Sequence, residues 1–222
     1  MTRTELLVLD LAGTTVQDDG VVERAFALAH ERTGIARGMP WSEALAHVRA
    51  TMGQSKLDVF THLGGGDVAA AHRATAAFED AYAELVAADG AQEVPGATQF
   101  LRETAERGIR VVLTTGFAPA TRDVLLDALG WRDLVDGALS PADVGRGRPA
   151  PDLVLAAALR AQVSAVSAVA VAGDTVSDVR CGLNAGAGLV VGVLTGAHDR
   201  AALQEAGAHL VLPDVTALTP HL

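Results

Sequence analysis

Short apolar runs alternate with longer amphipathic stretches over most of the chain. The first run, residues 5–10, is Leu- and Val-rich, ends in the carboxylate of Asp10 and leads into a tight Gly-Thr-Thr loop. Further Val/Leu/Ala runs occupy 110–113, 166–172, 189–194 and 210–212, and they alternate with helical spacing at 99–107, 120–129 and 152–161. Strands this apolar are typical of parallel sheets buried under helices on both faces. The pattern predicts an α/β fold with a doubly wound, Rossmann-like parallel sheet.

The segment from residue 18 to residue 92 follows a different pattern. It has no strand-like run, and its Ala-rich stretches carry apolar residues at helical spacing, which predicts helices at 22–32, 41–52, 55–63 and 68–88. Glycine- and proline-containing breaks separate these stretches. We therefore expect an all-helical cap domain, 18–92, inserted into an α/β core domain formed by 1–17 and 93–222.

Composition and charge exclude several classes of protein. The chain has 222 residues, half of them apolar, and a formal net charge of −10. That charge repels phosphate backbones and anionic lipid surfaces, so we expect neither nucleic acid nor a membrane as partner. No uncharged apolar stretch reaches the roughly 18 residues that a membrane-spanning helix needs. The single cysteine, Cys181, cannot form an internal disulfide, and we expect a cytoplasmic protein.

Polar residues that could perform phosphoryl chemistry lie where predicted strands end. Asp10 ends the first strand, Thr114 the second, and Asp174 follows the run 169–172. Arg148 lies in a Gly/Pro-rich loop. In open parallel sheets, active sites collect outside the carboxyl ends of the strands, so we expect these side chains to meet there.

A carboxylate can attack phosphorus only when the charge of the phosphoryl group is neutralised. With Asp10 as nucleophile, a Mg²⁺ ion held by Asp10, Asp174 and the backbone carbonyl of Ala12 would provide this neutralisation. Asp178 lies one helical turn after Asp174 and would steady the metal site. Each of these aspartates taken alone is equally consistent with a helix cap or a turn; the ordered set is the specific signal.

Five stretches of the chain form an ordered set of motifs: 10–16, 52–58, 114–117, 147–151 and 173–178. Together they resemble hydrolases of the haloacid dehalogenase superfamily, and within it phosphonatase, the phosphonoacetaldehyde hydrolase family. The resemblance implies an aspartyl-phosphate mechanism with Mg²⁺ as cofactor, and a small phosphonate or phosphate as substrate. Catalytic roles fall to Asp10, Lys56, Thr114 and Arg148, with Thr114 and Arg148 binding the phosphoryl oxygens. Substrate contacts fall to Gly13, Thr14, Met52, Thr115 and Gly116. A homodimer is compatible with the family, although no sequence feature specifies one.

Two positions favour cleavage of a carbon–phosphorus bond. Phosphatases of the superfamily carry a second aspartate two residues after the nucleophile, where this chain has Ala12. Without that acid, a phosphate monoester with a poor leaving group should react about 10²- to 10⁴-fold more slowly. Lys56, the single lysine of the chain, falls at the position of the Schiff-base lysine of phosphonatase. An iminium ion formed on this amine would accept the electrons of the breaking bond. By composition alone, Lys56 would be an exposed residue on a helix of the cap, because lysine is mostly exposed.

The resemblance is incomplete. Phosphonatase has a histidine three residues after its lysine, where this chain has Val59, and the loop 17–20 is acidic. An acidic loop disfavours a doubly charged phosphonate unless it points into solvent. Two alternatives remain open: a Mg²⁺-dependent phosphatase of small phosphate monoesters such as phosphoglycolate, and a non-catalytic protein that binds a phosphorylated ligand. The intact Asp10 argues against the second.

Overall fold

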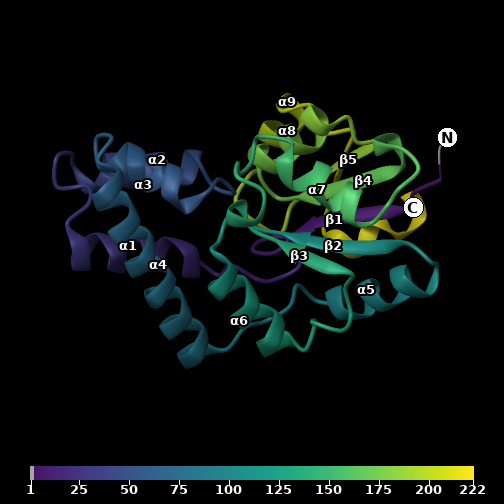
Figure 1. Ribbon diagram of the computed structural model, residues 1–222, viewed down its shortest axis with the longest axis horizontal. Helices are drawn as coiled ribbons and strands as arrows, with labels where there is room; N and C mark the ends of the chain where they lie inside the picture. The colour runs from purple at the N-terminus through teal and green to yellow at the C-terminus, as the bar shows by residue number, and fades with distance from the viewer. Residues whose placement is uncertain (1–2) are drawn as a thin grey trace.

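A six-stranded parallel sheet forms the centre of the computed structural model, which describes residues 3–222 (Figure 1). Its strand order is β3-β2-β1-β4-β5-β6. The strands are β1 (Leu6–Asp10), β2 (Arg110–Thr114), β3 (Gly137–Leu139), β4 (Val169–Gly173), β5 (Leu189–Val193) and β6 (Leu210–Leu212). The prediction of a doubly wound α/β fold is confirmed. Because the strand order reverses at β1, between β2 and β4, the carboxyl end of β1 lies at the topological switch point.

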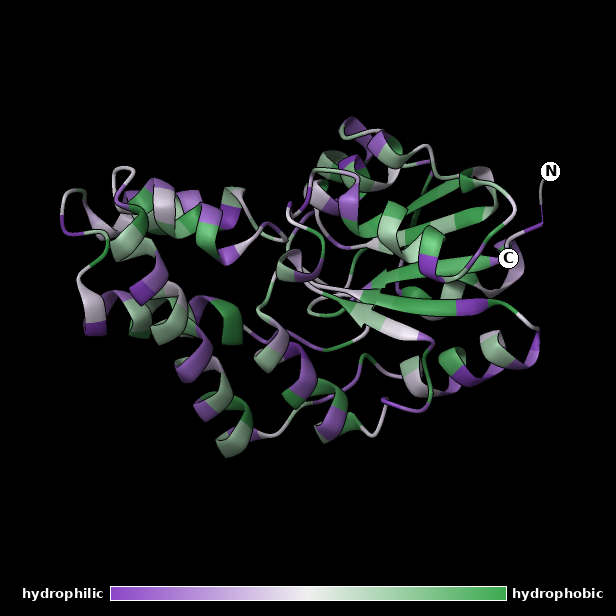
Figure 2. Cartoon of the chain, viewed as in Figure 1, coloured by the Kyte–Doolittle hydropathy of each residue, from purple (hydrophilic) through white to green (hydrophobic). Residues whose placement is uncertain are grey.

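The central strands β1 and β4 are fully buried because helices cover both faces of the sheet. In β1, Leu7 and Leu9 belong to one buried apolar cluster, and Leu6 and Val8 belong to the cluster on the opposite face. Figure 2 shows the strands as the most apolar elements of the molecule. The helices of this part are α5 (Ala97–Glu106), α6 (Pro119–Leu129), α7 (Asp152–Arg160), α8 (Val176–Ala185) and α9 (Arg200–Glu205). Three short 3₁₀ segments complete it: Pro141–Asp143, Val166–Ala168 and Val215–His221.

Two details of the strand prediction differ from the structure. The run 166–172 was expected to be one strand, but Val166–Ala168 form a 3₁₀ turn and β4 begins at Val169. The apolar character of this run does not distinguish a buried turn from a strand. Strand β3, at Gly137–Leu139, was missed because a three-residue strand is too short to show a period.

Four helices follow β1 and precede β2 in the sequence, and they pack together beside the sheet as a separate part of the molecule (Figure 1). They are α1 (Val21–Thr33), α2 (Trp41–Ala50), α3 (Lys56–Leu63) and α4 (Val68–Asp89), each within two residues of the predicted bounds. We call α1–α4 the helical cap. The exact division at 17/18 and 92/93 stays a prediction, and Met1 and Thr2, which it assigns to the core, lie outside the described residues.

Aromatic packing holds the helical cap together. The Phe26 ring lies 4.9 Å from that of Phe60 and 4.8 Å from that of Phe78, measured between centroids. Phe117, just after β2, continues this cluster, with its centroid 4.6 Å from that of Tyr82. Aromatic pairs at these spacings contribute about 0.5–1.5 kcal/mol each beyond their burial. The helical cap therefore packs against the sheet domain through an apolar seam beside β2.

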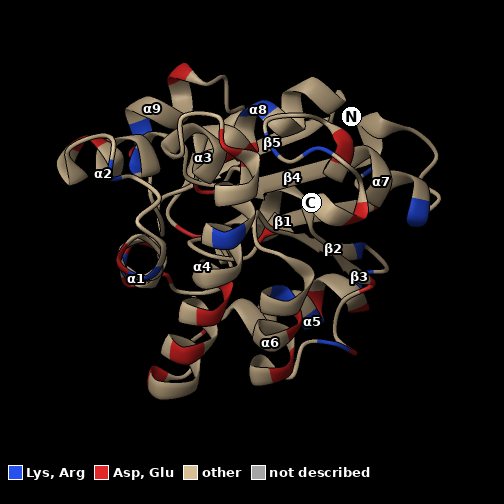
Figure 3. Ribbon diagram, turned by 60° about the vertical axis from the view of Figure 1, so that its left-hand side comes forward, with Lys and Arg blue, Asp and Glu red and all other residues tan. Residues whose placement is uncertain are grey.

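The C-terminal half of α4 carries several acidic residues, as Figure 3 shows. Two of its carboxylates pair with arginines of α1: Arg24 with Asp89 at 3.1 Å and Arg32 with Glu84 at 2.6 Å. Exposed pairs of this kind contribute at most about 1 kcal/mol each, so apolar packing dominates the α1–α4 contact. Within residues 3–222, no helix combines the length and the apolar character needed to cross a bilayer.

Candidate active site

Three neighbouring strands bring the predicted acidic residues to one edge of the sheet. Parallel pairing places Asp10 of β1 opposite Thr114 of β2, and Leu9 opposite Ala172 of β4. Asp174 follows β4 directly, and Asp178 lies in the first turn of α8. The strand ends therefore meet as the sequence predicted.

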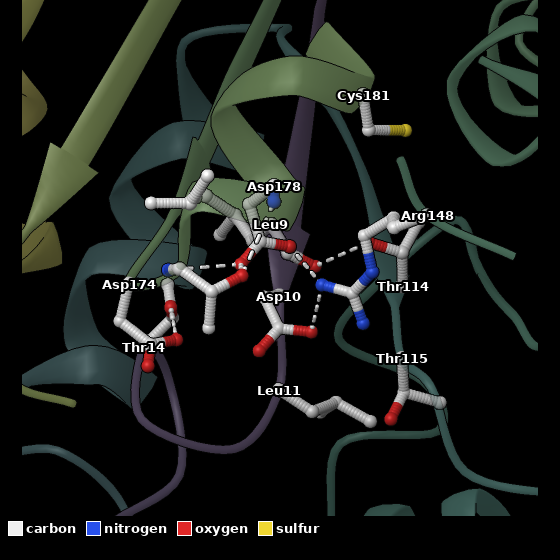
Figure 4. A network of polar contacts seen from close by, with 12 residues as sticks. Leu9, Asp10, Leu11, Thr14, Thr114, Thr115, Arg148, Asp174, Asp178 and Cys181 are labelled. Atoms are coloured by element: carbon white, nitrogen blue, oxygen red, sulfur yellow. Dashed lines mark hydrogen bonds and ion pairs between the residues drawn. The ribbon is translucent and has the colours of Figure 1, made fainter. Parts of the chain in front are cut away.

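Arg148 connects two of the aspartates (Figure 4). Its Nη1 donates to Oδ1 of Asp10 at 2.6 Å and also to Oδ1 of Asp178. All three side chains are at least 95% buried. The other oxygen of Asp178, Oδ2, accepts from the amide and the hydroxyl of Thr175, at the N-terminus of α8. Both carboxylate oxygens of Asp178 are thus occupied, and its role in the structure is to hold Arg148 and the start of α8.

Asp174 is held by two donors from different loops. The hydroxyl of Thr14 donates to its Oδ1 at 3.0 Å, and the amide of Ala197 donates to its Oδ2 at 2.8 Å. Burial, and secondarily the charge of Asp10, raise the pKa of Asp174 to about 7. Gly13 adopts a φ of +86°, and a Cβ at this position would lie 2.5 Å from Oδ2 of Asp174. Gly13 therefore lets the loop after β1 approach this carboxylate closely.

The aspartate cluster has the character of a site for a divalent cation. Asp10, Asp174 and Asp178 each have a carboxylate oxygen within 4.8 Å of the others. Buried carboxylates this close repel one another, and the charge of Asp10 adds to burial in raising the pKa of Asp174; a cation would remove that repulsion. Oxygen ligands of this kind suit hard ions. Asp10 and Asp174 would hold the ion directly, beside the backbone of Ala12, which lines the same cavity.

Lys56 begins α3 and points into this site rather than into solvent, since only 5% of the residue is exposed. Its Nζ lies 5.2–5.5 Å from the ring centroids of Phe26, Phe78 and Phe117. Within residues 3–222, no group forms a hydrogen bond or ion pair with Nζ. Burial, and secondarily the charge of Arg148, lower the pKa of Lys56 to about 8.

A cavity of about 30 Å³ joins the two halves of the site. Its walls come from the sheet domain and from the helical cap: Asp10, Ala12, Asp18, Val22, Met52, Gly53, Lys56, Thr115, Gly116, Phe117, Arg148, Asp174, Thr175 and Ala197. The amide of Lys56 donates to the carbonyl of Gly116 at 3.4 Å. A Cβ at Gly116 would lie 2.4 Å from the carbonyl oxygen of Gln54. The helical cap is therefore closed on the sheet domain.

The predicted substrate contacts fall into two groups. Met52, Thr115 and Gly116 line the cavity, whereas the hydroxyl of Thr14 is engaged by Asp174. Thr114 is buried and its hydroxyl donates to the carbonyl of Leu9 at 3.4 Å. The roles given to these residues stay predictions.

Sequence reasoning missed several residues of the site. Ala197 follows β5 by a few residues, so the rule about strand ends could have found it. The ring cluster around Lys56 and the inward position of Asp18 carry no such signal, because they depend on how the helical cap packs. Val59, at the position of the expected histidine, is buried and apolar.

Comparisons with known proteins agree with this geometry. Residues 4–186 match the family model of haloacid dehalogenase-like hydrolases. A phosphonoacetaldehyde hydrolase from Syntrophobacter fumaroxidans is 32% identical over 193 residues, which cover 81% of this chain and 69% of that protein. In six further curated phosphonoacetaldehyde hydrolases, the chain matches less than half of the relative's length.

Two solved structures share nearly the whole fold. A phosphonoacetaldehyde hydrolase-like protein from Oleispira antarctica superposes with a TM-score of 0.82 at 25% identity, covering 98% of this chain and 91% of the other. A hydrolase from Pseudomonas syringae gives 0.84 at 25% identity, covering 98% and 97%. The chain belongs to the haloacid dehalogenase-like hydrolases and is related within them to phosphonoacetaldehyde hydrolase.

Proposed function

We propose that the protein hydrolyses the carbon–phosphorus bond of a small carbonyl phosphonate, with phosphonoacetaldehyde as the leading substrate. The observation that carries the proposal is the position of Lys56. It is a buried amine with a lowered pKa, and it lines the same small cavity as the carboxylate of Asp10. A nucleophile for phosphorus and a nucleophile for a carbonyl carbon therefore face one space.

The residues divide the chemistry between the two ends of the substrate. Lys56 condenses with the carbonyl group and releases water, which gives an iminium ion. Asp10 attacks phosphorus; the oxygen–phosphorus bond forms, the carbon–phosphorus bond breaks, and its electron pair passes into the iminium to give an enamine. Water then cleaves the aspartyl-phosphate, and protonation and hydrolysis of the enamine release the aldehyde and Lys56.

The charged groups around Asp10 stabilise the phosphoryl end. Mg²⁺ held by Asp10, Asp174 and the backbone of Ala12 would neutralise the phosphoryl charge. Arg148, which already donates to Asp10, fixes the direction of the attacking carboxylate. Its Nε is buried without a partner among the described residues and would be satisfied by a phosphoryl oxygen.

Ala12 supports the same assignment. It lines the cavity with a methyl group where an acid would be required to protonate a leaving alkoxide. A carbon leaving group needs an electron sink instead, and Lys56 supplies one.

The test is phosphate release from phosphonoacetaldehyde, other phosphonates and phosphate monoesters including phosphoglycolate, each with Mg²⁺ and with EDTA. We expect Mg²⁺-dependent release from phosphonoacetaldehyde, a borohydride-reduced adduct on Lys56, and loss of both in Lys56→Arg, which keeps the charge but cannot form the imine. Rapid phosphomonoester turnover that survives Lys56→Arg would instead identify a phosphatase. No release above the Asp10→Asn background for any compound would identify a non-catalytic binding protein.

A further inference from the structure

The carbonyl end of the proposed reaction needs a proton donor, and this inference rests on that proposed function. The hydroxyl of the first Lys56 adduct, a carbinolamine, must be protonated before it leaves as water, and the enamine carbon must be protonated after the phosphoryl group departs. Neither Ala12 nor Val59 has a proton to give. The donor must therefore be another residue that faces Lys56.

Asp18, in the loop between β1 and α1, occupies the required position. It lines the cavity of about 30 Å³ together with Lys56 and Asp10. It also lines an outer cleft of about 550 Å³ formed between α1, α2 and the loop 195–198. Asp18 thus stands at the boundary between the reacting groups and a space open to water, where a side chain can give up a proton and regain it.

One oxygen of Asp18 is fixed and the other is available. Oδ1 accepts from the amide of Val22 at 3.0 Å in the first turn of α1, which holds the carboxyl group in place. No hydrogen bond to Oδ2 is formed within residues 3–222. The neighbouring Asp19 is exposed, so the two halves of this acidic loop have different surroundings.

The other acidic groups near Lys56 are already engaged. Both oxygens of Glu79 accept hydrogen bonds, one from the amide of Ala118 at 3.0 Å and the other from the hydroxyl of Thr121. Burial, together with Asp18, Asp10 and Glu79, raises the pKa of the Tyr82 hydroxyl, which makes it a poor acid. Asp10 belongs to the phosphoryl end.

The surroundings of Asp18 also favour a protonated carboxyl group. Burial raises its pKa most, and the charges of Glu23 and Asp19 act in the same direction; the bond from Val22 and the charge of Lys56 oppose them. An acid with a raised pKa keeps its proton closer to neutral pH, as a general acid requires.

We propose that Asp18 is the proton-transfer residue for the carbonyl end of the substrate. Its Oδ2 gives a proton to the carbinolamine hydroxyl; the carbon–oxygen bond breaks, water leaves, and the nitrogen lone pair of Lys56 forms the iminium double bond. The carboxylate recovers a proton from water in the outer cleft. After carbon–phosphorus cleavage, the same group protonates the enamine carbon.

Imine formation can be measured without phosphorus or metal. We would follow reductive ethylation of Lys56 by acetaldehyde and cyanoborohydride in the wild type, in Asp18→Asn and in Asp19→Asn, by intact mass and peptide mapping. Asparagine keeps an Oδ1 that can accept from Val22, and Asp19→Asn removes the same charge from the next residue. Thermal unfolding reports whether each variant is folded.

Two possible roles of Asp18 predict opposite changes in the rate of adduct formation when Asp18 is replaced by asparagine. As a proton donor, its replacement by asparagine slows adduct formation, about 10²-fold for a general acid. As a mere counter-charge, its removal lowers the pKa of Lys56, leaves more neutral amine at pH 7 and speeds adduct formation. An Asp18→Asn rate equal to or above that of the wild type overturns the inference.

Phosphate release separates this inference from the function on which it rests. We expect the wild type to release phosphate and to form a Lys56 adduct. We expect kcat to fall about 10²-fold in Asp18→Asn but not in Asp19→Asn. A wild type that forms no Lys56 adduct overturns the proposed function and this inference with it. A wild type and an Asp18→Asn variant that turn over equally fast overturn the inference alone.

Discussion

At the scale of single residues, Lys56 combines an ordinary side chain with an unusual environment. Burial among aromatic rings and the charge of Arg148 lower its pKa to about 8. Only the neutral amine attacks a carbonyl, and its fraction rises about tenfold per pH unit below the pKa and levels off above it. We expect the rate of Lys56 acylation by a small acylating reagent, a reaction that needs no proton donor, to rise about tenfold from pH 6 to pH 7 and to flatten above pH 8, measured by mass spectrometry.

A short lysine peptide in the same reaction provides the control, because its amine titrates near pH 10.4 and its rate continues to rise up to that value. If the protein followed the peptide over the whole range, Lys56 would be exposed in solution and the closed site would not be the reactive one.

The protonation of Asp174 should make the affinity for Mg²⁺ depend on pH. Burial and Asp10 raise its pKa from 3.8 to about 7, so the folded chain binds this proton more tightly than the unfolded chain. Without metal, this group makes stability fall as pH rises from about 4 to about 7. Mg²⁺ needs the deprotonated carboxylate, so we expect its affinity to be about tenfold lower at pH 6 than at pH 8, by calorimetry. The thermal stabilisation by Mg²⁺ should fall in parallel.

Asp174→Asn is the matched variant, since it removes the charge and keeps the shape. It should be more stable than the wild type at pH 8 without metal, and it should lose the Mg²⁺ effect. A Mg²⁺ affinity that does not change between pH 6 and pH 8 would contradict a protonated Asp174.

The residues of the phosphoryl end could be predicted from the sequence because they depend on strand ends. Asp10 and Asp174 follow apolar runs, and parallel strands must bring their carboxyl ends to one edge. Asp18 and Phe78 could not be placed in this way. Their positions near Lys56 depend on side-chain packing between helices, and periodicity carries no information about which side chains meet across such a contact.

At the scale of secondary-structure elements, long periodic segments were predictable and short ones were not. The four cap helices have many apolar positions at helical spacing, whereas Gly137–Leu139 has too few residues to show any period. The contact between the α2–α3 loop and the loop after β2 is a further element-scale feature, and the pattern of apolar positions carried no signal for it.

Gly116→Ala tests that contact. The new Cβ would lie 2.4 Å from the carbonyl oxygen of Gln54, so the α2–α3 loop must move and carry Lys56 with it. A displacement of about 1 Å at reacting groups can cost about 10²-fold, and we expect a loss of 10- to 100-fold in kcat/KM with phosphonoacetaldehyde. Gly137→Ala is the control, because a Cβ there meets no atom within 4 Å. Equal activity of the two variants would show that cap closure does not require close packing at Gly116.

At the scale of the whole molecule, the cavity between Asp10 and Lys56 is too small for the substrate to enter in the closed state. About 30 Å³ accommodates a few water molecules at most, and a carbonyl phosphonate is larger. Substrate entry therefore requires the helical cap to separate from the sheet domain and close again, as lids of many enzymes do within a catalytic cycle. Cap movement should then be part of every turnover.

A reversible cross-link can test this movement. A Cβ built at Gly147 lies 3.1 Å from the Cβ of Ser55. The Cβ atoms of a disulfide lie roughly 3.5–4.5 Å apart, so a small shift would let cysteines at these two positions form one. That disulfide would join the α2–α3 loop to the loop that carries Arg148. We expect the oxidised double variant Ser55→Cys/Gly147→Cys to lose multiple turnover and to regain it with dithiothreitol. The two single variants should be insensitive to oxidation, since the native Cys181 is buried. Full turnover by the cross-linked protein would contradict this movement and show that substrate enters while the cap stays closed.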